Sequence, residues 1–97
     1  MSSSSPDNKF FVLQYNYVED YLERRVPIRP QHLEHALNAK ESGHLVMGGP
    51  FVNPSDAAIV IFKTPDRTVV ENFAKNDPYV RENVVSSFSI REWMVTV

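Results

Sequence analysis

Hydrophobic positions follow two kinds of spacing along this chain. Segments that are rich in aromatic and β-branched residues and bounded by polar turn formers predict β-strands. Four segments fit this description: residues 9–17, 44–50, 57–63 and 84–97. Apolar residues alternate in the last segment, so one side of that strand should carry Phe88, Ile90 and Met94, and the other side Trp93 and Val95.

Between these strands, apolar residues recur at helical spacing in two segments. The first should begin near Arg29, where Pro30 suits the first turn, and should end at Gly43, which supplies a left-handed cap. Its apolar stripe consists of Leu33, Ala36, Leu37 and the stem of Lys40.

The second helical segment follows residues 57–63. Its predicted start is Thr64 as N-cap, Pro65 as first helical residue and Asp66 as an acid that complements the helix dipole. It must end before Pro78, because a proline disfavours helical geometry at the residue before it. Its buried side should consist of Val69, Val70, Phe73 and Ala74.

The resulting order of elements is β-α-β-β-α-β. Residues 44–50 and 57–63 should form a hairpin around the turn sequence NPSD, and residues 18–28 a loop with one helical turn around residues 20–25. This order favours an α+β, ferredoxin-like fold, in which an antiparallel sheet carries both helices on one face.

The other face of this sheet has no predicted cover. Residues 57–62 are apolar on both sides, and the first and last strands also carry large apolar groups at odd and even positions. A bare sheet face of this kind would be an apolar patch large enough to require a partner. We therefore expect a homodimer in which two sheets pack face to face.

Composition narrows the classes of function. The chain has 97 residues, of which 42% are hydrophobic, which suits one globular domain over residues 9–97 after a disordered Ser-rich tail over residues 1–8. A net charge of -2 argues against nucleic acid as a partner. The absence of cysteine excludes disulfides, thiolate metal sites and Cys nucleophiles. Because no apolar run or signal-peptide pattern is present, we expect a cytoplasmic protein with no membrane contact.

The predicted topology brings five junctions between elements to one end of the sheet. The residues at these junctions are Asn16, Tyr17, Arg29, His32, Gly48, Gly49, Pro50, Asp56, Asp77 and Tyr79. His32 lies in the first turn of its helix, on the flank of the buried face, so it can lean toward this end. Histidine titrates near neutrality, and an adjacent carboxylate fixes its tautomer. We therefore predict that His32 and Asp77 form a pair for proton transfer.

Three stretches, taken in order, resemble the YCII-related family. They are RPQHL at residues 29–33, GHLVMGGP at residues 43–50 and NDPYV at residues 76–80, and the resemblance spans nearly everything from the first strand to the last. It implies the dimeric α+β barrel fold and a catalytic role for His32 with Asp77 as its partner. Three features depart from the family pattern: the Ser-rich extension, an NPSD turn without glycine, and Asn83 where glycine is common. Because the turn departs from the family pattern, the resemblance does not determine the rim of the pocket or the choice of substrate.

The candidate substrate-binding residues are Arg29, Gly49, Pro50, Tyr17 and Tyr79. Each has a structural alternative. Arg29 could bind an anionic group of the substrate, although pairing with glutamates of the preceding loop is slightly favoured. The two adjacent glycines better suit relief of crowding or a β-bulge than phosphate binding. Core packing suits the two tyrosines equally well.

The two catalytic candidates have structural alternatives as well. His32 could be a packing or capping histidine, and Asp77 before a proline could simply form a turn. His35 should be solvated, and neither it nor His44 is expected to be functional. The spread of the three histidines does not suit metal ligation, so neither a metal nor a cofactor is predicted.

Three functions compete at this stage. The first is a lyase or isomerase that moves a proton on a small organic molecule, with anions among the candidates, without a cofactor. The second is a dimer that binds a small ligand without converting it, since a fold does not fix a function. The third, an RNA-binding sheet, is opposed by the acidic balance and by a sheet face that the dimer would cover.

Overall fold

A computed structural model describes residues 8–97 of the chain. The predicted disordered tail, residues 1–8, lies outside the described residues except for Asn8. Within residues 8–97, no helix has the length and hydropathy that crossing a bilayer requires.

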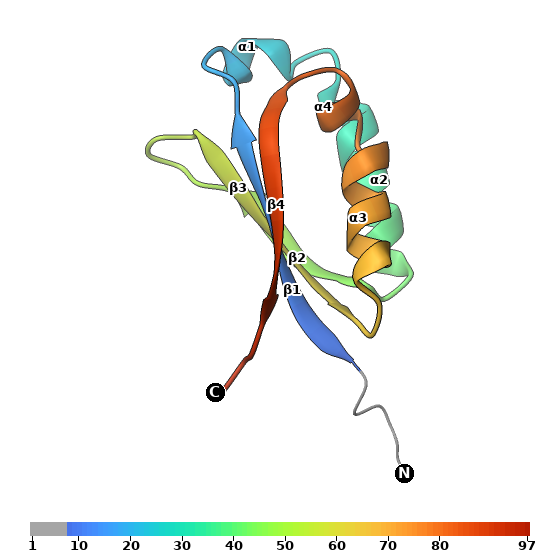
Figure 1. The fold of residues 1–97 in the computed structure, drawn as a ribbon. Coiled ribbons are helices and arrows are strands. Elements are labelled where there is room, and N and C mark those ends of the chain that lie inside the picture. The colour runs from blue at the N-terminus through green and yellow to red at the C-terminus, as the bar shows by residue number, and fades with distance from the viewer. Residues whose placement is uncertain (1–7) are drawn as a thin grey trace.

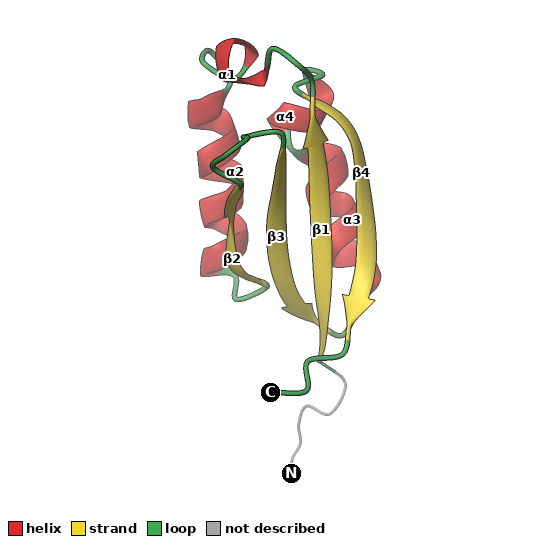
Figure 2. Ribbon diagram, turned by 90° about the vertical axis from the view of Figure 1, so that its left-hand side faces the viewer, coloured by secondary structure: helices red, strands yellow, loops and turns green. Residues whose placement is uncertain are grey.

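The chain forms one antiparallel sheet with helices on a single face (Figure 1). The elements in chain order are β1 (Lys9–Tyr17), α1 (Tyr21–Arg24), α2 (Arg29–Glu41), β2 (Leu45–Pro50), β3 (Ala57–Thr64), α3 (Arg67–Asn76), α4 (Pro78–Arg81) and β4 (Val85–Trp93). The strand order is β2-β3-β1-β4, and each neighbouring pair is antiparallel. Figure 2 shows α2 and α3 behind the four strands, so the α+β, ferredoxin-like prediction is confirmed.

The strand register decides which side chains face the helices. Leu13 of β1 pairs with Val60 of β3 and with Ile90 of β4, and all three are buried. Tyr15, two residues further along β1, therefore points to the same side, and its ring is fully buried. Phe73 of α3 packs over this face with its ring 5.0 Å from that of Phe62. The core thus lies between the sheet and α3.

The two long helices contribute very differently to this core. Helix α3 buries Val70, Phe73 and Ala74. Among the residues of α2, all of which the structure describes, none is buried. The prediction that Leu33 and Leu37 form a buried stripe is wrong in this respect, because they remain 39% and 58% exposed. These side chains border an open cavity instead of core atoms.

Three local predictions need correction. The N-cap of α3 is Asp66, whose carboxylate accepts a hydrogen bond from Thr68 N at 2.9 Å, and Thr64 belongs to β3 instead. β4 ends at Trp93, so the predicted strand residues 94–97 lie beyond it. The segment after Pro78, for which no helix was predicted, forms the short helix α4. Asp66 prevails as the cap because its side chain reaches the free backbone N–H groups of the first turn.

Two positions with left-handed backbone agree with the sequence. Gly43 ends the α2 segment with φ of 90°, as its role as a cap requires. Asn83 follows α4 with φ of 62°, a conformation that asparagine tolerates better than most residues. Asn83 therefore allows the chain reversal into β4.

Candidate functional site

Asp77 occupies the junction between α3 and α4. Its backbone is extended, with φ of -69° and ψ of 125°, because the following proline excludes helical geometry there. Its carboxylate turns back to cap α4 and accepts a hydrogen bond from Tyr79 N at 3.0 Å. The residue is completely buried. A break between two helices thus places a carboxylate inside the protein.

Two further donors converge on this carboxylate. The hydroxyl of Tyr15 donates to Oδ2 at 2.7 Å, and Nδ1 of His32 lies 2.8 Å from Oδ1. Together with the backbone N–H of Tyr79, they give the buried carboxylate three hydrogen-bond partners from β1, α2 and α4. These donors compensate the buried carboxylate for the hydrogen bonds that water would otherwise supply.

The tyrosine partner of this carboxylate is held in its protonated form. Burial, and then the negative charge of Asp77, raise the pKa of Tyr15 far above its ordinary value. The hydroxyl therefore keeps its proton and can only donate to the carboxylate. It occupies Oδ2 and leaves Oδ1 to the histidine and the backbone.

His32 is fixed on two sides. Its ring stacks on that of Tyr79 with centroids 3.7 Å apart and an angle of 3° between the planes. Because Nδ1 faces a carboxylate, the neutral ring carries its proton on Nδ1 and has a lone pair on Nε2. The side chain is 17% exposed, and the residue borders a cavity. A base of fixed orientation therefore faces a space that a small molecule could enter.

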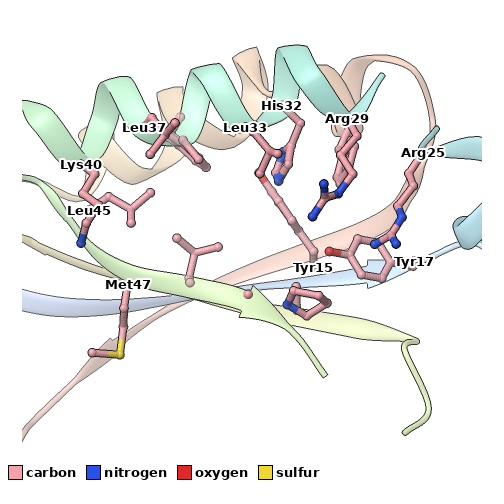
Figure 3. Close-up of a pocket in the computed structure, with 18 of the residues that line it drawn as sticks. Tyr15, Tyr17, Arg25, Arg29, His32, Leu33, Leu37, Lys40, Leu45 and Met47 are labelled. Atoms are coloured by element: carbon pink, nitrogen blue, oxygen red, sulfur yellow. The ribbon is translucent and has the colours of Figure 1, made fainter. Parts of the chain in front are cut away.

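The cavity lies between α2 on one side and β2 and β3 on the other, and its volume is about 440 Å³ (Figure 3). Gly48 keeps the β2 wall thin: a Cβ atom there would lie 3.1 Å from Val60 Cγ1, tighter than ordinary contact. The register shift of β2 lies between Leu45 and Met47, whereas Gly48 and Gly49 pair regularly with Val60 and Ile59, so Gly48 relieves crowding and the bulge precedes the two glycines.

Three cationic side chains line this space, and no acidic side chain of the described residues does. Arg25, Arg29 and Lys40 line the cavity, and none of its lining residues is an aspartate or glutamate. Arg25 donates to the hydroxyl of Tyr21 at 2.9 Å, and Lys40 to the carbonyl of Val46 at 2.9 Å. Within residues 8–97 Arg29 forms no ion pair, so the favoured pairing with loop glutamates is wrong. The geometry suits an anionic ligand.

All the candidate substrate-binding residues, Arg29, Gly49, Pro50, Tyr17 and Tyr79, border the same cavity. Tyr79 is also buried in the core, so it both packs in the core and lines the site. Burial is the main cause that raises the pKa of Tyr79 to about 12. Two other junction residues lie elsewhere: Asn16 binds Ser87 Oγ at 3.1 Å, and Asp56 does not border this cavity.

Three residues of the site were not predicted from the sequence. Tyr15 and Tyr21 were assigned no role, and Arg25 lay in a loop without a pattern. The alternation along residues 9–17 contained a signal, because it placed Tyr15 on the same side as Leu13. His35 was expected to be solvated, but its Nε2 lies 2.9 Å from the carbonyl of Phe73, and it packs α2 on α3. Within residues 8–97, no three His, Asp or Glu side chains cluster as metal ligands would.

Comparison with known proteins finds the same fold in solved structures and identifies a family for this chain. In solved structures, the chain is similar to a 5-chloro-2-hydroxyhydroquinone dehydrochlorinase from Burkholderia phenoliruptrix AC1100 in complex with 2,5-dihydroxybenzoquinone. The TM-score is 0.75 at 17% identity, over 88% of this chain and 93% of that one. The protein PA3566 from Pseudomonas aeruginosa has a TM-score of 0.65 at 8% identity, over 98% of this chain and 100% of that one.

A curated sequence relative is the derivative of benzaldehyde biosynthesis cluster protein C of Emericella nidulans. It is 33% identical over 75 residues, which cover 67% of this chain and 76% of the relative. The model of the YCII-related domain matches residues 9–94, nearly the whole of the described fold. The chain therefore belongs to the YCII-related family.

Proposed function

We propose that this protein is a lyase or isomerase in which His32 moves a proton on a small, oxygenated organic molecule. The observation that carries the proposal is the fixed His32 ring, with Nδ1 on the buried Asp77 carboxylate and the ring at the edge of the cavity. A general base works best when its orientation and tautomer are set before the substrate arrives.

The chemistry follows from the two ring nitrogens. Neutral His32 would accept a proton at Nε2 from a carbon next to a carbonyl group, and the C–H electron pair would form an enolate. The imidazolium would then return the proton to another atom of the same molecule, which is an isomerisation. In a lyase, the electron pair would instead form a double bond as a leaving group departs with its bonding electrons. Both reactions balance without a redox partner, so no cofactor is needed.

The surrounding residues suit the charges that such a reaction creates. The developing oxyanion would lie among cations, of which Arg29 has no ion pair among residues 8–97 and could bind it. The imidazolium would be stabilised by Asp77 at 2.8 Å. Tyr17, Tyr79, Gly49 and Pro50 would form the walls that orient a flat molecule.

The comparisons support a ring as the substrate. The similar solved structure is named as a dehydrochlorinase of a hydroxylated hydroquinone and holds a dihydroxybenzoquinone. The curated relative is named for a cluster that makes a benzaldehyde derivative. Both names describe oxygenated six-membered rings, which agree in shape and polarity with a cavity of tyrosines, aliphatic side chains and arginines.

We also propose that a second copy of the chain covers the outer face of the sheet. The strand register shows that Val12, Ile59 and Ile61 point away from the helices. All three side chains are half-buried, although no helix of residues 8–97 covers this face. Trp93 and Met47, at 48% and 63% exposed, extend this apolar face. Two such faces packed together would remove it from water, as the family resemblance implies.

Proton transfer can be tested without knowledge of the natural substrate. The protein is incubated in D₂O with a panel of hydroxylated quinones, phenols and cyclic diketones, including 2,5-dihydroxybenzoquinone, and deuterium uptake at carbon is followed by NMR. We expect at least one compound to exchange faster with the protein, and His32→Gln to abolish the gain. His44→Gln, which changes a histidine away from the cavity, is the matched control.

Two results would speak against the proposal. If no member of the panel exchanges above the rate without protein, oxygenated rings are not its substrates. If a compound binds with unchanged affinity to wild type and to His32→Gln but never exchanges, the site recognises without converting, which is the competing function.

A further inference from the structure

Helix α2 presents apolar side chains that the core does not use. Leu33 and Leu37 are 39% and 58% exposed, although both border the cavity. In the same helix layer, α3 buries Val70, Phe73 and Ala74. A helix whose leucines face an open space leaves apolar surface in water, which is unfavourable unless something covers it.

The cavity is elongated along this helix, and its charged groups lie at its ends. Figure 3 shows Arg25 and Arg29 at one end, next to His32, and Lys40 at the other. Arg29 and Lys40 are eleven positions apart on α2, so their backbones are separated by about 16 Å along the axis. Leu33, Leu37 and Leu45 lie between them and make the middle of the cavity apolar.

The volume also exceeds what a single small ring would fill. About 440 Å³ falls within the range of ~300–1,000 Å³ that holds drug-sized ligands. The end near His32 is rich in tyrosines and arginines, and it suits a flat head with oxygen atoms. The apolar middle then remains for another part of the same molecule.

We propose that the substrate is amphiphilic, with an oxygenated anionic head at Arg25, Arg29 and His32 and a hydrocarbon tail that runs along Leu33, Leu37 and Leu45 toward Lys40. This inference rests on the proposed function, because it takes the head to be the part that meets His32. Lys40 marks the end of the tail: its Nζ donates to the carbonyl of Val46, so its methylene stem is left to line that end of the cavity.

The test is a binding series with the intact chain. The probes are 2-hydroxybenzoates with a 4-alkyl chain that lengthens from methyl to heptyl, and affinity is measured by titration calorimetry. A methylene that is buried gains ~0.8 kcal/mol, which corresponds to about fourfold in affinity. Since the leucines are open on one side, we expect about twofold to fourfold per methylene until the chain reaches Lys40.

Two substitutions at leucines of nearly equal exposure separate the cavity from the general surface. Leu37→Gln should flatten the dependence on chain length, with little effect on the methyl probe. Leu22→Gln, at a position 56% exposed on α1 and outside this cavity, should leave the whole series unchanged. Arg29→Gln should lower the affinity of every probe by about tenfold without changing the dependence, because it acts on the head.

Several outcomes would overturn the inference. Affinity that does not depend on chain length would do so, and it is also the result expected if a second copy of the chain fills the cavity. An equal chain-length dependence in Leu37→Gln and wild type would place the tail elsewhere. Loss of binding in Lys40→Gln but not in Arg29→Gln would reverse the orientation. None of these results depends on deuterium exchange, so the proposed chemistry stands or fails separately.

Discussion

Substitution of Asp77 by asparagine would separate the charge of the buried carboxylate from its shape. The amide oxygen can take the place of Oδ1 and keep the contacts with His32 and Tyr79 N, which lie at 2.8 and 3.0 Å. The amide nitrogen then meets the hydroxyl of Tyr15, which must turn to accept a hydrogen bond. Because asparagine and aspartate have the same shape, the backbone can keep its conformation, and only the negative charge is lost.

The effect on stability should be small, because two contributions oppose each other. Hydrogen bonds to a charged group contribute about 1.5–3 kcal/mol and those between neutral groups about 0.5–1.5 kcal/mol, so three weakened bonds cost about 3 kcal/mol. Removal of a fully buried charge returns a desolvation penalty of several kcal/mol. We expect the free energy of unfolding to change by less than about 2 kcal/mol. Asp77→Ala, which leaves three donors without an acceptor, should cost more.

The effect on proton transfer should be large. Without the carboxylate, the imidazolium loses its counter-charge. The neutral ring also loses the charged acceptor that favours the tautomer with its proton on Nδ1. General acid–base groups contribute about 10²–10⁴-fold, so deuterium exchange should slow by that range. The ¹⁵N NMR signals of the His32 ring give a direct measure. When the His32 ring of the wild type is neutral, its Nδ1 should be protonated and its Nε2 should not. The variant should show a mixture of the two tautomers.

Two results would refute this reasoning. One is a wild-type exchange rate in a folded Asp77→Asn variant, since the charge would then have no part in the chemistry. The other is wild-type His32 with its proton on Nε2, because that tautomer cannot donate to Oδ1. Urea unfolding of both proteins is the control that separates these outcomes from a loss of structure.

Three further predictions concern the fold around the site. Tyr15→Phe removes the donor to the buried Oδ2 and should lower the free energy of unfolding by about 1–3 kcal/mol in urea titrations; no change would mean that the 2.7 Å bond carries no net stability. Stability should be full below pH 10 and fall as the pH rises toward 12, because the pKa of Tyr79 is raised from 10.0 to about 12 and the unfolded chain loses its proton first; a flat urea midpoint over this window would contradict it. Ile61→Lys on the outer sheet face should convert a dimer to a monomer in sedimentation experiments, and a wild type that is already monomeric at micromolar concentration would exclude the sheet-to-sheet interface.

Local sequence determined most of the elements. Strand β1 matches its predicted bounds, Lys9–Tyr17, because a segment so rich in aromatic residues and bounded by polar turn formers favours a strand. Helix α2 begins at Arg29, where Pro30 favours a first turn, and ends before Gly43. Such features depend on neighbours within a few residues, so they can be read from the chain alone.

The contact between His32 and Asp77 could be predicted in part from the sequence. Element order alone brought the two residues to the same end of the sheet, across 45 positions of chain. The third partner, Tyr15, lies 62 positions from Asp77, and its contact depends on how β1 is placed in the sheet beneath the helices, which no local pattern displays.

Only the tertiary structure decided what the apolar face of α2 does. Its leucines have the spacing of a core helix, but α3 fills the space over the sheet and leaves them beside a cavity. It also decided that Arg29 meets that cavity rather than a loop glutamate. The physical reason is the same in both cases: periodicity tells which side chains share a face, whereas the packing of other elements determines what that face meets.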